Sequence, residues 1–228
     1  MTYNVSKSVI ITAGGSGLRM GADIPKQFIE LAGKPILMRT IEKFVQFDAK
    51  IKIVVTLPES QFEFWKDLCV KHQFNVNFIL TTGGETRFQS VKNALAFCKD
   101  SGYVAVHDGV RPLVSLETIK RCFDCAKQNG NAIPVIEALE SIREISGSTS
   151  VSVDRNKYKM VQTPQVFETK ILIDAYKQEF SPLFTDDASV VENLGHKIFL
   201  VEGNRENIKI TTPIDLLIGE ALMTNINR

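Results

Sequence analysis

The chain has 228 residues, of which 44% are hydrophobic and 23% charged, enough apolar material for one sizeable core. The 27 Lys and Arg residues nearly balance the 26 Asp and Glu residues, for a formal net charge of +1. This balance excludes the broad basic surface that binds duplex nucleic acid or an anionic membrane. The longest apolar runs are far shorter than the ~20 residues of a membrane helix, and the first residues lead into a strand-like segment without a signal peptide. We therefore expect a cytoplasmic protein with no nucleic-acid or membrane partner.

Short apolar runs alternate with segments of helical periodicity over the first 136 residues. In chain order, we expect a strand at Val9–Thr12, a helix that begins at Lys34-Pro35, a strand at Ile51–Leu57, a helix at about 60–71, a strand at Val76–Leu80, a helix at Thr86–Cys98, a strand at Tyr103–His107, a helix at Leu116–Asn129 ended by Gly130, and a strand at Ala132–Ile136. This alternation predicts an α/β fold, a single Rossmann-like domain over residues 1–228 with a mostly parallel, doubly wound sheet.

The segment Glu140–Met160 has no helical period. Residues 141–145 and 151–154 alternate polar and apolar side chains around a turn of Ser, Gly and Thr at 146–150, a pattern typical of a β-hairpin. An isolated hairpin is at best marginally stable, because it has no second apolar face to cover it. The segment is therefore either a loose surface hairpin or an arm that packs on a second subunit. We favour the arm at about 140–160, and with it a homodimer.

Cys122 and Cys125 form a C-x-x-C pair, the spacing of a redox pair or of half a zinc site. A redox pair normally lies just before a helix, where the helix dipole lowers the thiol pKa. This pair instead falls late in a predicted helix, and the second half of a zinc site is missing from the sequence. We expect both cysteines to be structural, and the spacing of all four cysteines suggests no disulfide framework.

A glycine-rich loop follows the first strand, with the sequence Ala-Gly-Gly-Ser-Gly-Leu-Arg-Met-Gly at 13–21. Glycine lets backbone N–H groups approach an anion closely. The loop lacks the Gly-Lys-Ser/Thr ending of a Walker A loop and fits the dinucleotide-binding pattern poorly. Arg19 and Lys26 follow within and just after it. Two cations beside such a loop suit a polyphosphate whose charge rises during a reaction.

This loop, together with Pro-Lys-Gln at 25–27, resembles the signature of sugar-nucleotide pyrophosphorylases and small nucleotidyltransferases. Six further motifs follow in order: Gly-Gly-Glu-Thr-Arg-Phe-Gln-Ser-Val at 83–91, His-Asp-Gly-Val-Arg-Pro at 107–112, Val-Asp-Arg at 153–155, Gln-Thr-Pro-Gln-Val-Phe at 162–167, Thr-Asp-Asp-Ala-Ser at 185–189, and Val-Glu-Gly at 201–203 with Asn-Ile-Lys-Ile-Thr at 207–211. Together they resemble the 2-C-methyl-D-erythritol 4-phosphate cytidylyltransferase family over nearly the whole chain. The resemblance implies transfer of a cytidylyl group from CTP to a methylerythritol phosphate, with release of pyrophosphate, in the non-mevalonate isoprenoid pathway.

The resemblance also implies roles at the nucleotide end of the site. Arg19 and Lys26 would be catalytic, stabilising the charge that develops on the triphosphate. Asp108 would bind Mg²⁺ or another divalent cation, which needs few protein ligands, although an Asx turn before Gly109 is the alternative role of this side chain. The implied nucleotide-binding residues are Ala13, Gly14, Gly15, Gly17, Gly84, Glu85, Arg87, Ser90, Asp108, Gly109 and Arg111. The alternatives are an ordinary helix residue for Ser90 and surface arginines for Arg87 and Arg111.

The acceptor end of the site, by the same resemblance, would position a polyol phosphate through Arg155, Lys209, Thr185 and Ser141. In this family the arm crosses to the other subunit, so Arg155 would serve the neighbour's site and catalysis would require a dimer. Lys209 lies in an alternating segment, where an exposed strand lysine is the alternative.

Departures from the family pattern leave the nucleotidyl-transfer motifs intact and bear mainly on the acceptor. The first loop begins Thr-Ala-Gly-Gly where Pro-Ala-Ala-Gly is usual, Gly109-Val110 replaces a common Ala-Ala pair, and Ser141 stands where Thr is common. A ribitol-5-phosphate cytidylyltransferase, which shares most of the motifs, is therefore the near alternative. A non-catalytic nucleotide-binding protein is a further alternative, and an oxidoreductase is the remote one, because a fold alone does not settle function.

Overall fold

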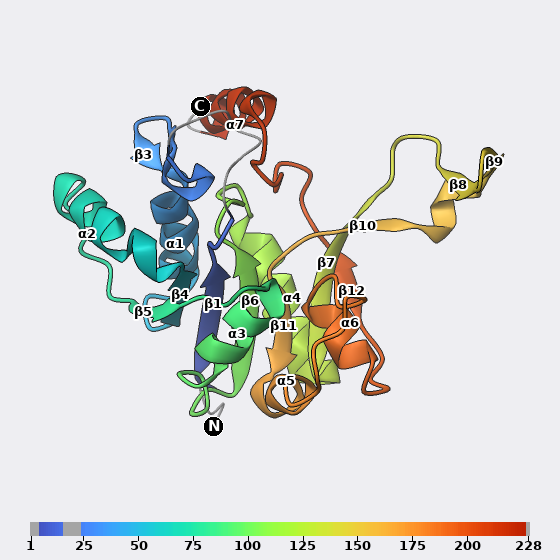
Figure 1. The fold of residues 1–228 in the computed structure, drawn as a ribbon, viewed down its shortest axis with the longest axis horizontal. Helices are drawn as coiled ribbons and strands as arrows, with labels where there is room; N and C mark the ends of the chain where they lie inside the picture. Colours follow the sequence, from blue (N-terminus) through green and yellow to red (C-terminus); the bar gives the residue numbers. More distant parts are fainter. Residues whose placement is uncertain (1–4, 16–23, 227–228) are drawn as a thin grey trace.

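The computed structural model describes residues 5–15 and 24–226, and in them one eight-stranded sheet forms the centre of the molecule (Figure 1). The strand order is β10-β7-β11-β6-β1-β4-β5, with β12 also paired to β7. The strands are β1 (Lys7–Thr12), β4 (Lys52–Leu57), β5 (Ile79–Thr82), β6 (Tyr103–Asp108), β7 (Asn131–Glu137), β10 (Lys159–Val161), β11 (Gln165–Glu168) and β12 (Leu200–Glu202). The predicted α/β fold is confirmed.

The sheet is mostly parallel, as predicted, but it contains antiparallel strands that the sequence pattern did not indicate. β1 pairs in parallel with β4 and β6, β4 with β5, and β12 with β7. β11 runs antiparallel between β6 and β7, and β10 is antiparallel to β7. Val166 and Phe167 of β11 are fully buried, so this short strand completes the core.

Helices cover both faces of the sheet, which confirms the doubly wound arrangement (Figure 1). One layer contains α1 (Ile36–Phe47), α2 (Phe62–Lys71) and α4 (Leu116–Asn129), and the other contains α3 (Arg87–Leu95), α5 (Thr169–Ala175) and α6 (Asp187–Glu192). The alternation of side chains along β1 separates the two layers. Val9 and Ile11 join the core of the first layer, and Ile10 joins the core of the second.

The remaining elements are short, apart from one terminal helix. Besides the two strands of the hairpin described below, they are η2 (Lys26–Phe28), β2 (Glu30–Leu31), β3 (Lys34–Pro35), η3 (Glu59–Gln61), η4 (Arg155–Lys157) and α7 (Pro213–Ile226). α7 lies over β2, and Ile210 before it packs with Leu31 in a small third core cluster. No helix in the described part of the chain is long and apolar enough to span a bilayer.

Several of the predicted boundaries need correction. The helix expected at Thr86–Cys98 covers only Arg87–Leu95. The helix expected from Lys34-Pro35 begins at Ile36, because those two residues form β3 and pair with β2. The strand expected at Val76–Leu80 starts three residues later, at Ile79. The apolar side chains of Val76 and Phe78 pack against the core cluster that includes Trp65, outside any strand. This packing, and not a strand, accounts for the apolar residues at these two positions.

The predicted hairpin is present and stands away from the domain (Figure 1), but Ser146 pairs with Thr149, so its turn is shorter than the expected 146–150. β8 (Arg143–Ser146) pairs with β9 (Thr149–Ser152), and Gly147 in the connecting turn has a φ of +57°, which glycine adopts without strain. Ile145 is 71% exposed and Val151 is 56% exposed. No other part of the described chain therefore covers these apolar side chains of the arm.

All four cysteines are free thiols, and the C-x-x-C pair lies within α4 as expected. Cys122 is fully buried, and burial raises the pKa of its thiol well above the usual range. Among the described residues, no cluster of three or more His, Cys, Asp or Glu side chains could hold a metal ion. The complete burial of Cys122 within α4 agrees with a structural role for this residue.

Candidate functional site

A pocket of about 270 Å³ opens at the C-terminal edge of the parallel strands. The register pairs Thr12 at the end of β1 with Asp108 at the end of β6, and Leu57 of β4 with Thr82 of β5. The loops that leave these strands therefore meet at one edge, where ligands bind in open α/β sheets. Thr12 itself lines the pocket.

Most of the predicted nucleotide-binding residues line this pocket. Those on its wall are Ala13, Gly14, Gly15, Gly84, Glu85, Arg87, Ser90 and Asp108, and they are joined there by Lys26, predicted as catalytic, and Lys209, predicted for the acceptor. They come from the β1 loop, η2, the start of α3, the end of β6 and the segment before α7. The fold thus brings together residues that lie almost 200 positions apart in the sequence.

Two other predicted residues lie just behind the wall. Gly109 packs against the β1 loop so closely that a Cβ atom there would lie 3.0 Å from the Ala13 Cβ and 3.1 Å from the Thr12 oxygen. Arg111 donates from Nε to Asp108 Oδ2 (3.0 Å) and from Nη1 to the Asn207 carbonyl (2.8 Å). Both residues therefore shape the pocket from outside its lining.

The residues predicted for the acceptor divide into two groups. Lys209 lines the pocket, whereas Thr185, Ser141 and Arg155 are exposed and do not. Arg155 lies in η4 at the base of the arm and donates to the carbonyl of Leu139, which directly precedes the arm. Gly17 and Arg19 lie outside the described residues.

Lys26 crosses the glycine-rich loop at close range. An added Cβ atom on Gly15 would lie 2.8 Å from Lys26 Cε and 3.1 Å from its Nζ. Only glycine accommodates this approach without moving the lysine. Gln27 follows on η2, lines the same pocket, and donates from Nε2 to the Gln61 side chain at 2.7 Å. This amide therefore ties η2 to η3, after β4.

Asp108 is the central anion of the pocket. Its Oδ2 lies 3.0 Å from Arg111 Nε and 3.1 Å from Lys209 Nζ, and its Oδ1 lies 3.9 Å from Arg87 Nε. Burial on its own raises the pKa of this carboxyl, but Lys209, Arg87 and Arg111 together hold it well below its usual range. Asp108 is therefore an ionised carboxylate at neutral pH.

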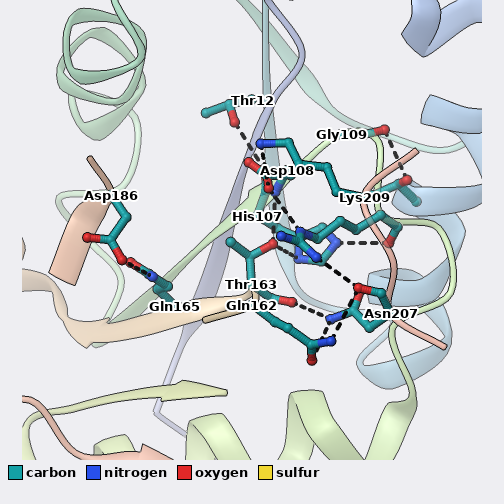
Figure 2. A network of polar contacts seen from close by, with 12 residues as sticks. Thr12, His107, Asp108, Gly109, Gln162, Thr163, Gln165, Asp186, Asn207 and Lys209 are labelled. Atoms are coloured by element: carbon teal, nitrogen blue, oxygen red, sulfur yellow. Dashed lines mark hydrogen bonds and ion pairs between the residues drawn. The ribbon is translucent and has the colours of Figure 1, made fainter. Parts of the chain in front are cut away.

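A chain of buried hydrogen bonds fixes the end of β6 (Figure 2). The Asp108 N–H donates to Thr163 Oγ1 (3.1 Å), which lies 3.0 Å from His107 Nδ1. His107 Nε2 lies 3.1 Å from the Arg111 carbonyl. A carbonyl only accepts, so Nε2 carries the proton, and Nδ1 accepts from Thr163. Burial lowers the pKa of His107 to about 4, which keeps the ring neutral.

The start of α3 is fixed by its own side chains. Thr86 caps the helix by accepting from the Gln89 N–H at 3.0 Å. Ser90 Oγ donates to the Thr86 carbonyl (3.0 Å) and accepts from the Gly84 N–H (2.9 Å). The Ser90 hydroxyl therefore shapes the Gly83-Gly84 turn, and its proton is already used, so it can contact a ligand only as an acceptor.

Thr12, Gln27, Thr86 and Val110 also line the pocket, although the sequence reasoning assigned them no role. Each is directly next to a residue that was singled out, so adjacency was the available signal. His107 and Thr163 were likewise within recognised motifs without an assigned function. Their contribution depends on a contact between residues 56 positions apart in the sequence, which no local pattern reveals.

The family model described as 2-C-methyl-D-erythritol 4-phosphate cytidylyltransferase matches residues 7–225. A protein of that name from Bacteroides thetaiotaomicron is 56% identical over 96% of this chain and 100% of its own, and one from Porphyromonas gingivalis is 48% identical over 95% and 97%. Among solved structures, the 4-diphosphocytidyl-2C-methyl-D-erythritol synthase of Anaerococcus prevotii superposes with a TM-score of 0.83 at 28% identity, covering 96% of each chain. The bifunctional IspDF of Campylobacter jejuni gives a TM-score of 0.79 at 30% identity, over 93% of this chain and 54% of that one. The chain belongs to the 2-C-methyl-D-erythritol 4-phosphate cytidylyltransferase family.

Proposed function

We propose that the pocket binds CTP and transfers its cytidylyl group to 2-C-methyl-D-erythritol 4-phosphate, releasing pyrophosphate. A phosphate oxygen of the acceptor forms a bond to the α-phosphorus of CTP, and the bond from that phosphorus to the pyrophosphate oxygen breaks. The attacking oxygen is already ionised, so the reaction needs no general base, and positioning and charge neutralisation dominate. The observation that carries the proposal is the convergence of glycine backbone and cationic side chains on one pocket at the strand ends.

The triphosphate is proposed to lie along the β1 loop. Gly14 and Gly15 bring their backbone to the pocket wall, and Lys26 crosses directly above Gly15. Lys26 is thus placed to stabilise charge that builds on the phosphates in the transition state. Arg19 is proposed to act with it. The base is proposed to contact the Gly84-Glu85 turn, where Ser90 can offer only an acceptor.

A divalent cation such as Mg²⁺ is proposed at Asp108, and the residues fit this ion. Asp108 is a single ionised carboxylate facing the pocket, and Mg²⁺ typically binds through one or two carboxylates, substrate phosphates and waters. Arg111 and Lys209 both contact its Oδ2, so Oδ1, which lies 3.9 Å from Arg87, is the oxygen better placed to bind the ion. When bound, the ion neutralises charge on the phosphate oxygens.

The acceptor phosphate is proposed to bind Lys209, which reaches the pocket while its side chain remains 44% exposed. Arg155 is proposed to complete the acceptor site from a second subunit. The same chain holds Arg155 at the base of an arm that stands away from the domain, outside the pocket lining (Figure 1). The exposed apolar side chains of the arm would be covered in a homodimer. Thr185 and Ser141 remain predicted acceptor contacts.

The acceptor is tested by incubating the protein with CTP, Mg²⁺ and either 2-C-methyl-D-erythritol 4-phosphate or ribitol 5-phosphate, and measuring pyrophosphate release. The names of the relatives favour the methylerythritol compound, and faster turnover of the ribitol compound would refute that choice. Lys26→Ala should abolish turnover with the fold retained by circular dichroism. Unchanged turnover would refute the role of Lys26.

The shared site is tested by mixing two inactive variants, Lys26→Ala and Arg155→Ala, under conditions that exchange subunits. If Arg155 acts in the neighbour's site, each mixed dimer has one complete site, and activity recovers to about a quarter of wild type in a statistical mixture. If Arg155 acts within its own chain, every site lacks either Lys26 or Arg155 and stays inactive. No recovery, with mixed dimers shown by mass spectrometry, would contradict the crossed arm.

A further inference from the structure

The Arg87 guanidinium is held at the edge of the pocket by a second, fully buried carboxylate. Arg87 Nη1 donates to Asp187 Oδ1 (2.9 Å) and Nη2 donates to Asp187 Oδ2 (2.6 Å), a bidentate pair. Its Nε faces Asp108 Oδ1 at 3.9 Å. The arginine therefore bridges a carboxylate that lines the pocket and one that does not.

Asp187 is anchored on its other side by a tyrosine. The Tyr176 hydroxyl donates to Asp187 Oδ1 at 2.6 Å. Asp187 is 0% exposed and Tyr176 is 2% exposed. Burial, and then the negative charge of Asp187, raise the pKa of Tyr176 well above its usual range, so the hydroxyl keeps its proton and remains a donor.

The position of Asp187 is set by the start of α6. Asp186 caps this helix, accepting from the Ser189 N–H while Ser189 returns a bond to the Asp186 N–H, so Asp187 is the first helical residue. Gln165 of β11 bonds both sequence neighbours of Asp187. It donates to Asp186 Oδ2 at 2.7 Å (Figure 2) and accepts from the Ala188 N–H at 2.9 Å. The sheet itself therefore fixes the carboxylate.

This geometry removes the freedom of a long side chain. An exposed arginine loses rotamer entropy when it is fixed by a ligand. Here both terminal nitrogens are already bonded to Asp187, which leaves the Nε edge directed at Asp108. Burial on its own lowers the pKa of Arg87, but Asp187 more than offsets this and keeps the guanidinium charged.

We propose that Asp187, supported by Tyr176, is a positioning residue of the nucleotide site. It fixes the Arg87 guanidinium beside Asp108 before nucleotide arrives, so that binding CTP with its metal ion does not have to order this side chain. Asp187 reaches the nucleotide only through Arg87, and it is not part of the pocket wall. The inference rests on the proposed function of the pocket as a CTP site.

The test measures the dissociation constant of CTP by calorimetry in the presence of Mg²⁺, with thermal unfolding measured on the same samples. Asp187→Asn keeps the shape and removes the charge, and we expect about tenfold weaker CTP binding, which corresponds to about 1.4 kcal/mol. Tyr176→Phe removes one hydrogen bond, and we expect about threefold weaker binding. The double variant Arg87→Gln with Asp187→Asn should bind no more weakly than Arg87→Gln alone.

Two controls separate positioning from a loss of stability. Val191→Ala shortens a buried side chain of the same helix without touching Arg87, and Asp124→Asn removes an exposed carboxylate of α4 that pairs with Lys120. Both should bind CTP as the wild type does. Wild-type affinity in Asp187→Asn and Tyr176→Phe, additive losses in the double variant, or an equal loss in Val191→Ala would each overturn the proposal. If Asp187→Asn does not fold, the CTP affinity of Tyr176→Phe tests the proposal instead.

These outcomes are separate from those of the proposed function. Wild-type protein that binds CTP but transfers it to neither polyol phosphate would refute the proposed reaction and leave the positioning test intact. Wild-type protein that does not bind CTP would refute both. The binding readout therefore does not depend on the identity of the acceptor.

Discussion

The Thr163 hydroxyl is the link whose removal tests the hydrogen-bond chain behind Asp108. The side chain is buried, accepts from the Asp108 N–H (3.1 Å) and bonds His107 Nδ1 (3.0 Å). Thr163→Val preserves the shape but leaves one buried donor and one buried acceptor unpaired. Each unpaired group costs about 1–3 kcal/mol, so for the two groups together we expect the free energy of unfolding to fall by about 2–6 kcal/mol.

The assay is urea denaturation followed by circular dichroism, with Thr163→Ser as the matched control. Serine retains the hydroxyl and loses one methyl group, at a cost of about 1 kcal/mol. The valine variant is the closer match in volume, so a purely steric account predicts that it is the more stable of the two. Thr163→Val that is as stable as Thr163→Ser would refute the argument that the hydroxyl joins Asp108 to His107.

Three further predictions concern other residues of the domain. His107 has a folded pKa of about 4 against 6.5 for an ordinary imidazole, so between these values only the unfolded chain gains a proton. Acidification from pH 6.5 to 4 should therefore lower the free energy of unfolding by up to about 3 kcal/mol more in wild type than in His107→Gln, and equal slopes would contradict this. Gly15→Ala should displace the flexible end of Lys26 and reduce pyrophosphate release at least about tenfold by moving a preorganised donor, with an unchanged melting temperature, whereas wild-type turnover would argue against the close approach. Native Cys122, buried and with a raised pKa, should resist iodoacetamide while the protein stays folded, and its rapid alkylation would contradict a structural role.

The first half of the fold was predictable because its signals are local. Buried parallel strands such as β4 (Lys52–Leu57) are mostly apolar. The sequence of α4 also includes a capping residue at each end. Ser115 accepts from the Thr118 N–H at one end, and Gly130 adopts a φ of +87° at the other. Local signals of this kind can be identified in the sequence alone, since they depend on residues three or four positions apart.

The second half was less predictable because its strands are short and run in both directions. β11 has four residues and follows Pro164, and hydrophobicity does not encode that Val166 pairs antiparallel with Ala105 of β6. The error at Val76–Leu80 has the opposite origin. There the apolar side chains before Ile79 are buried, as predicted for a strand, but they pack on the aromatic cluster around Trp65. Their backbone joins no strand, and β5 begins only at Ile79.

The pocket lining was predictable for a different reason, namely that the motifs resemble those of one family. Residues with a direct place on the wall, such as Lys26 and Lys209, were found in this way. Asp187 lies within the motif at 185–189 but received no role, because nothing in the local sequence indicates which side chain it contacts. Its partner Arg87 lies 100 positions away in the sequence, so its role depends on tertiary structure alone.

The near-neutral net charge conceals how charge is arranged at the site. Four cations on described residues, Lys26, Arg87, Arg111 and Lys209, meet in or beside one pocket. Asp108 contacts the last three of them, and Asp187 holds Arg87 from outside the pocket. Without Asp108 and Asp187, the like charges would repel and the long side chains would spread into solvent. A phosphoryl-transfer site gains most from charges that are already in place. The buried carboxylate is therefore as much a part of the phosphate-binding arrangement as the arginine it holds.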